Sequence, residues 1–284
     1  MIIMITKKLV LLFTLLLFPK ILIASELDYV DNICYYMDSS TKEAVVMFHL
    51  DEDYTFYSGD ITIPSTINYK GIDYIVSSII DYCFGGCSLL TSVTLPNTIV
   101  SIGKHAFEGC SKLTSVNIPN KVTVINDSTF MNCSSLTAIK LHDNITEIGE
   151  YAFFGCSSIK SINIPSNITT IKDRTFYNCT SLERVGLSQN LTSIGVRAFF
   201  NCKKLNTIVI PKNVKEIKSG AFNKCNSLTM FFFEPIDPPS LPFFDDYFCN
   251  NVKVYVPIQS LEKYEKELIT VKNIIGKKPN TVIG

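Results

Sequence analysis

Hydrophobic positions in the central part of the chain recur with a period of 23 residues. One unit, residues 87–109, reads CSLLTSVTLPNTIVSIGKHAFEG. The pattern L-x-x-V-x-L that starts at Leu90 places alternate side chains on one face, which predicts a short β-strand. Pro96 ends this strand because proline has no backbone N–H to donate. Ile99 and Ile102 then form a second inward-facing side of the unit.

The same spacing runs through seven units without an insertion. A Cys marks each unit, a Phe stands three residues before it, and a Leu or Ile stands three residues after it. The two main columns are Cys87, Cys110, Cys133, Cys156, Cys179, Cys202 and Cys225, and Phe84, Phe107, Phe130, Phe153, Phe176, Phe199 and Phe222. One such strand cannot bury its apolar side alone, so neighbouring units must stack about 4.8 Å apart. The pattern predicts a repeat solenoid, mainly β, with a parallel β-sheet on one face and a cap at each end.

The repeat accounts for the CFGGC segment at residues 83–87. Cys87 begins the Cys column, and Cys83 stands where later units carry Ala, so both are predicted core positions. A zinc site would need two further ligands nearby. Disulfides between adjacent units are the alternative, but parallel side chains point alongside rather than toward each other. Cys34 and Cys249 lie outside the repeat, and their pairing stays open.

The units resemble the BspA-like subclass of leucine-rich repeats, as in IPNKVTVINDSTFMNCSSLTAI and IPSNITTIKDRTFYNCTSLERV. The resemblance covers residues 61–234, and the flanking segments 57–79 and 252–268 look like those of Bacteroidetes members. It implies a secreted or surface protein, as found in host-associated bacteria and some parasitic protists, where several members act as adhesins.

The remaining segments differ from the repeat. Residues 1–25 combine a basic start, an apolar run from Leu9 to Phe18 and small residues at the end, which is typical of a secretory signal peptide. The run is too short to span a bilayer, so no transmembrane segment is expected after cleavage. Residues 26–60 read as an N-terminal β cap. Residues 235–284 read as a C-terminal cap and tail, with a strand over 252–256 and a helix over 260–268 that starts at Ser260 as N-cap.

The composition favours no catalytic chemistry. Charge is balanced, with 26 Lys plus Arg against 26 Asp plus Glu, which argues against a nucleic-acid partner. The histidines, His49, His105 and His142, are explained by their cap or repeat positions. The acidic pairs Asp51 with Asp53 and Asp245 with Asp246 lack the spacing of a calcium loop. We therefore expect no enzyme, no metal site and no cofactor.

Outward positions of the predicted strand face are the candidate binding residues. In the middle units these are Ser115, Asn117, Lys140, Ser161, Asn163 and Arg184. The last outward pair, Met230 and Phe232, is predicted to be covered by the C-terminal cap. The expected function is adhesion or protein binding at a host interface, with a protein or glycan ligand such as a host matrix protein. The alternative is a structural component of the cell envelope without a host ligand.

Overall fold

The computed structural model describes residues 25–48, 57–241 and 244–277. The expected signal peptide lies outside these residues except for Ser25, as do His49 and the acidic pair at 51 and 53. Within the described part of the chain, no helix is long and apolar enough to cross a membrane.

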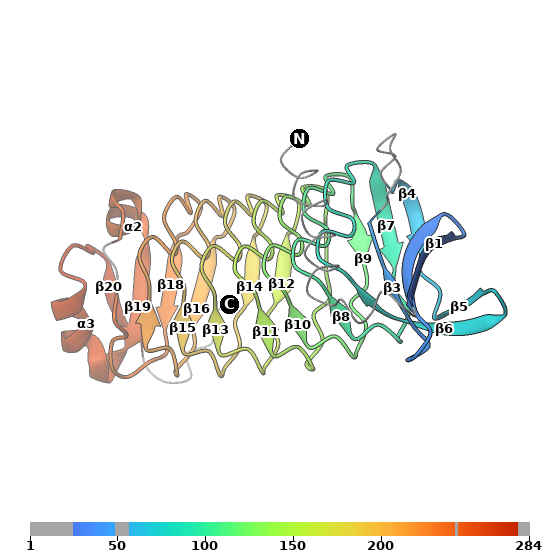
Figure 1. Cartoon of the computed structure of the whole chain (residues 1–284). Coiled ribbons are helices and arrows are strands. Elements are labelled where there is room, and N and C mark those ends of the chain that lie inside the picture. Colours follow the sequence, from blue (N-terminus) through green and yellow to red (C-terminus); the bar gives the residue numbers. More distant parts are fainter. Residues whose placement is uncertain (1–24, 49–56, 242–243, 278–284) are drawn as a thin grey trace.

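The predicted solenoid is confirmed (Figure 1). Its first side, the strand face, carries β4 (Gly59–Thr62), β7 (Leu90–Thr94), β9 (Ser115–Val116), β12 (Ser161–Asn163), β14 (Arg184–Gly186), β16 (Thr207–Ile210), β18 (Met230–Phe233), β19 (Lys253–Pro257) and β20 (Ile274–Lys277). Its second side carries β8 (Ser101–Ile102), β10 (Val124–Ile125), β11 (Glu147–Ile148), β13 (Thr170–Ile171), β15 (Ser193–Ile194) and β17 (Glu216–Ile217). Strands of neighbouring units pair in parallel with the 23-residue register, as in Thr207 with Met230. The ladders join each unit to the next because the backbone groups of so short a strand find no partners within the unit.

The third side of each unit is a series of turns that ends at the Phe and Cys columns, and we call it the turn side. Its backbone groups also pair between units: Phe153 N–H donates to the Thr175 carbonyl at 2.9 Å, and Phe130 N–H donates to the Ala152 carbonyl at 2.9 Å. Backbone hydrogen bonds between units therefore hold all three sides of the solenoid. The three sides together enclose the apolar side chains.

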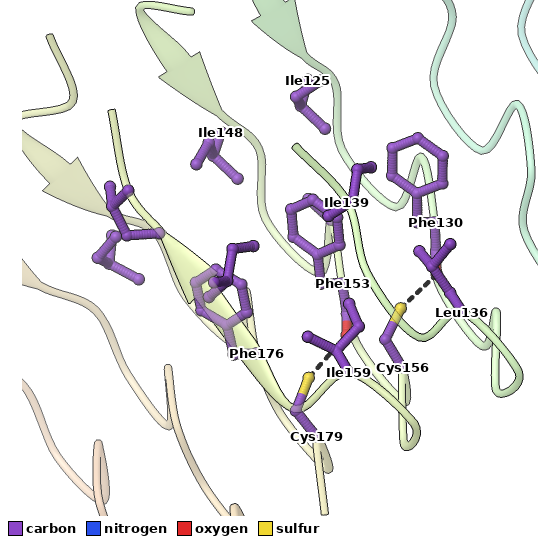
Figure 2. Packing of buried hydrophobic residues seen from close by; sticks show 14 of the residues in the cluster. Ile125, Phe130, Leu136, Ile139, Ile148, Phe153, Cys156, Ile159, Phe176 and Cys179 are labelled. Atoms are coloured by element: carbon purple, nitrogen blue, oxygen red, sulfur yellow. Dashed lines mark hydrogen bonds between the residues drawn. The ribbon is translucent and has the colours of Figure 1, made fainter. Parts of the chain in front are cut away.

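The Phe column is the axis of the core. Consecutive rings from Phe84 to Phe222 stack at centroid distances of 5.1–5.5 Å with interplanar angles of 13° or less. Figure 2 shows Phe130, Phe153 and Phe176 in this column, with Cys156 and Cys179 beside it. Cys156 Sγ donates to the Phe130 carbonyl at 3.1 Å, and Cys179 Sγ donates to the Phe153 carbonyl at 3.2 Å. The thiol thus fills a small apolar slot and also satisfies a buried carbonyl.

All ten cysteines are buried, as the core interpretation predicts for the column. Cys34 lies in β2 (Ile33–Asp38) and Cys249 lies in α2 (Asp246–Asn251), at opposite ends of the solenoid (Figure 1), so these two do not pair within one chain. No group of three or more His, Cys, Asp or Glu side chains in the described residues is arranged to hold a metal ion.

A mixed sheet covers the N-terminal end of the solenoid. It consists of β1 (Ser25–Val30), β2, β3 (Glu43–Val46), β6 (Ile72–Ile79) and β5 (Thr66–Tyr69), in the order β1-β2-β3-β6-β5. β3 and β6 pair in parallel, and the other neighbours in this order are antiparallel. β6 also pairs with β8, which links this sheet to the second side of the solenoid. The Tyr57 hydroxyl accepts a hydrogen bond from Cys34 N–H at 3.0 Å and donates one to the Met47 carbonyl at 2.9 Å.

The C-terminal end contains α2, β19, the 3₁₀ turn η2 (Ile258–Ser260), α3 (Leu261–Glu267) and β20. The predicted strand and helix are confirmed by β19 and α3. The predicted capping role of Ser260 is wrong, because its side chain makes no capping bond and its hydroxyl is buried without a partner. Ser260 ends the 3₁₀ turn with a ψ of 4°, so it lacks the extended conformation that turns an N-cap oxygen toward the first helical N–H groups. Helix α2 and strand β20 were not predicted from the sequence.

Units alternate on the turn side with a period of 46 residues. Asp81, Asp127 and Asp173 each accept the backbone N–H of the next unit through Oδ1, at 2.7–3.0 Å. The next unit carries a glycine where it approaches that aspartate, at Gly103, Gly149 and Gly195. A Cβ at these glycines would lie 2.3–2.6 Å from the aspartate's backbone nitrogen, so the close contact requires glycine.

Candidate binding surface

The structure places the predicted binding residues on one face but in different surroundings. Ser115 lies in β9, and Ser161, Asn163 and Arg184 lie in β12 and β14, where Ser161 pairs with Arg184 in register. Lys140 belongs to a unit that forms no strand on this face. The sheet is consequently interrupted between β9 and β12, which the uniform spacing of the sequence did not predict.

The two predicted asparagines differ in what their side chains contact. Asn117 Oδ1 accepts the backbone N–H of Leu95 at 2.7 Å, and its Nδ2 donates to the Leu95 carbonyl at 2.8 Å. The amide thus takes the place of a backbone partner where β9 ends. Asn163 lies against the next unit, with Oδ1 only 2.6 Å from the position of a Cβ on Gly186. The Asn117 amide is therefore less available to a ligand than the sequence suggests, whereas Asn163 is exposed.

The two cations are the more available members of the set. Lys140 and Arg184 are exposed, and neither forms an ion pair with another described residue. They are two units apart, which corresponds to about 10 Å along the sheet. They can contact one extended partner together, but they do not form a pocket.

The C-terminal part of the strand face is apolar. Parallel register aligns Val209, Phe232, Tyr255 and Ile275 in one outward column. The Phe232 ring stacks on Tyr255 at 4.5 Å, and Lys277 Nζ lies 5.5 Å from its centroid. Phe232 is buried as a result, which confirms that the C-terminal cap covers it. Val209 and Ile275 remain 40% and 38% exposed.

Tyr255 and Ile275 were not predicted as surface residues of the strand face, because they follow the last repeat and lie in the segment predicted to be a cap. The alternation in KVYVP, residues 253–257, carried the signal: it buries Val254 and Val256 and leaves Lys253 and Tyr255 outward. β19 and β20 therefore extend the strand face beyond the last repeat.

No catalytic arrangement is found among the described residues that the sequence singled out. His105 Nδ1 lies 2.8 Å from Glu108 Oε2, and its ring stacks on Tyr82 at 4.4 Å. His142 Nε2 lies 3.0 Å from the Pro119 carbonyl oxygen. Asp245, proposed and discounted as a calcium ligand, caps α2 by accepting Phe248 N–H at 3.0 Å. Each of these groups has a structural partner of its own.

A parallel solenoid with Leu, Ile and Phe columns inside and an open strand face defines a leucine-rich repeat scaffold, a class that presents an extended surface to binding partners. The chain belongs to the BspA type leucine rich repeat family, whose profile matches residues 52–180 and 146–264 in six copies.

Two solved structures are similar to this chain. A leucine-rich repeat protein from Bacteroides ovatus is 30% identical, over 88% of this chain and 67% of that one, with a TM-score of 0.68. A leucine rich cell surface protein from Faecalibacterium prausnitzii is 26% identical, over 83% of this chain and 72% of that one, with a TM-score of 0.65. Proteins of curated function yield no significant match.

Proposed function

We propose that this protein is a non-enzymatic, exported repeat protein that binds a partner protein through its strand face, as an adhesin at a host interface. The observation that carries the proposal is the gradient on that face, from the exposed cations Lys140 and Arg184 to the apolar column at Val209, Tyr255 and Ile275. An apolar and aromatic centre beside charged and polar residues is the usual composition of a protein interface. The N-terminal segment expected to direct export and the relative named as a cell surface protein support the location.

The test is binding of the purified protein to a panel of extracellular matrix proteins, plasma proteins and glycans, measured by biolayer interferometry. Two variants probe the face: Lys140→Glu with Arg184→Glu removes its positive charge, and Val209→Asp disrupts its apolar column. The matched control, Lys121→Glu with Lys212→Glu, makes the same charge change at exposed lysines in turns beyond the strand.

We expect saturable binding to a protein ligand that both strand-face variants weaken at least about 10-fold, which corresponds to about 1.4 kcal/mol. The control variant should bind as the unmodified protein does. Unchanged affinity in both strand-face variants would contradict the assignment of the face. A panel without any saturable ligand would contradict adhesion to a host.

A further inference from the structure

Three aromatic rings form a second stack outside the core, on the turn side. Phe154 stacks on Tyr177 at 4.8 Å, and Tyr177 stacks on Phe200 at 4.7 Å, with the rings within 9° of parallel. All three are half-buried, so their edges reach solvent. The fold does not require aromatic residues here, because the equivalent position in other units holds Gly85, Glu108, Met131 and Asn223.

Two arginines beside this stack occupy a backbone conformation that favours glycine. Arg174 and Arg197 have φ values of 54° and 52°, and the equivalent residue in the next unit is Gly220, at 67°. A side chain costs about 1 kcal/mol or more in this left-handed region. The other left-handed column of the turn side uses mostly Gly and Asn, which adopt it at lower cost. The preceding units place Tyr82, His105, Ser128 and Tyr151 at the same position with φ values of 54–59°, so the fold accepts a side chain here and the arginine side chains emerge at a fixed place on the turn side.

These side chains make the surface basic. The Arg174 guanidinium lies 5.4 Å from the Tyr151 ring centroid, and Arg197 and Lys224 lie 5.8 and 5.2 Å from that of Phe200. We call Phe154, Tyr177, Phe200, Arg174, Arg197 and Lys224 the turn strip. Residues 174–224 contain nine basic and only two acidic residues.

Two carboxylates beside the turn strip accept hydrogen bonds from backbone groups of its units. Asp173 Oδ1 accepts Val196 N–H at 2.7 Å, and Asp245 Oδ2 accepts Lys224 N–H at 3.0 Å. Aromatic ring edges carry partial positive charge, so they add to the attraction for an anionic partner.

The N-terminal cap of the same chain has the opposite charge. Its described segments, residues 25–48 and 66–79, hold six carboxylates and two lysines. Asp28, Asp31 and Asp73 are exposed. The hydrogen bond from the Tyr69 hydroxyl, at 2.6 Å, lowers the pKa of Asp28, so this group is ionised at neutral pH.

We propose that the turn strip of one copy binds the acidic N-terminal cap of a second copy, in an antiparallel pair. The two regions are four to five units apart, or roughly 20–25 Å along the solenoid. An antiparallel arrangement lets both contacts form at once and closes the assembly with two-fold symmetry, the commonest symmetry of soluble oligomers. Tyr, Phe and Arg are also enriched at interface centres. This pairing uses the turn side and does not depend on a ligand of the strand face.

Sedimentation equilibrium of the purified protein tests the pairing. We expect a dimer at about 100 μM chain in about 50 mM NaCl, and dissociation in about 500 mM NaCl, where the charges are screened. Arg174→Gly with Arg197→Gly should raise the dimer Kd at least about 10-fold with little change in Tm, because relief of the left-handed conformation offsets the loss of the 2.8 Å bond that Arg174 Nη1 donates to the Tyr151 hydroxyl. A Tm that falls together with dimerisation would assign the arginines a structural role and overturn the proposal.

A charge swap provides the decisive comparison. Arg174→Glu with Arg197→Glu makes the turn strip acidic, and Asp31→Lys with Asp73→Lys makes the cap more basic. Lysine is tolerated at the positive φ of Asp31, since Lys42 and Lys70 already adopt positive φ here, and Asp73 is an exposed residue of β6. Each variant alone should be monomeric, and an equimolar mixture should form a heterodimer. The control Lys121→Glu with Lys212→Glu should dimerise normally. A monomeric unmodified protein at low salt, or a mixture that stays monomeric, would overturn the proposal.

Discussion

Replacing Gly149 with alanine tests the close approach between alternating units. The added Cβ would lie 2.5 Å from Asp127 N and 2.6 Å from Asn126 C. These are backbone atoms held by ladders on both sides, so they cannot move away without disturbing neighbouring units. Overpacking of this kind costs about 1–3 kcal/mol.

The substitution also disturbs the hydrogen bond beside the contact. Asp127 Oδ1 accepts Glu150 N–H at 3.0 Å, and a hydrogen bond to a charged group contributes about 1.5–3 kcal/mol. Together the two effects predict a loss of about 2.5–6 kcal/mol in the free energy of unfolding. At about 2–4 °C per kcal/mol for a chain near this size, the Tm should fall by about 5–24 °C.

Thermal unfolding followed by circular dichroism measures this change, with Gly186→Ala as the matched control. The control Cβ would meet Asn163 Oδ1 at 2.6 Å, but that atom ends a side chain that can rotate. We expect the control to cost less than about 1 kcal/mol. Equal shifts in Tm for the two variants would show that the backbone contact between units is not what requires glycine at position 149.

Two further predictions concern buried polar groups. Burial raises the pKa of the Cys179 thiol from 9.0 to about 12, so iodoacetamide should label it only after unfolding in urea. Because the pKa of this thiol is higher in the folded protein than in the unfolded chain, the protonated thiol contributes its full stabilisation below pH 9 and loses it as pH rises toward 12. A urea midpoint that stays unchanged across this range would contradict the prediction. Tyr57→Phe removes the bonds to Cys34 N–H and the Met47 carbonyl and should destabilise the N-terminal cap by about 2 kcal/mol, seen as faster hydrogen exchange in β2 and β3. Unchanged exchange rates there would refute this second prediction.

Most of the solenoid was predictable because its structure is local along the stack. Each backbone ladder and core column joins a residue to its equivalent 23 positions away, so the period of the Cys and Phe columns is also the period of the contacts. The alternation with a period of 46 was present in the sequence as well, in Asp127 and Asp173 and in Gly149 and Gly195. Its structural basis is the close contact of each glycine, such as Gly149, with the backbone of the preceding aspartate, and the sequence alone does not show that contact.

The candidate surfaces were less predictable for two reasons. On the strand face, alternation correctly identified the outward positions, but only the paired strands show that Asn117 bonds to Leu95 and that the sheet is interrupted at Lys140. On the turn side, the direction in which a side chain points depends on the left-handed backbone at residues such as Arg174 and Arg197. Their φ values follow from the stacking of the units.

The sequence by itself determined the period, the strand and core positions, the buried role of the Cys column and the family, because each of these repeats at a spacing that only one kind of stacking satisfies. The tertiary structure decided which polar side chains remain available for binding, where the strand face is interrupted and how the aromatic rings of the turn strip align. Those features depend on contacts between particular residues of adjacent units, and such contacts differ from unit to unit although the spacing does not.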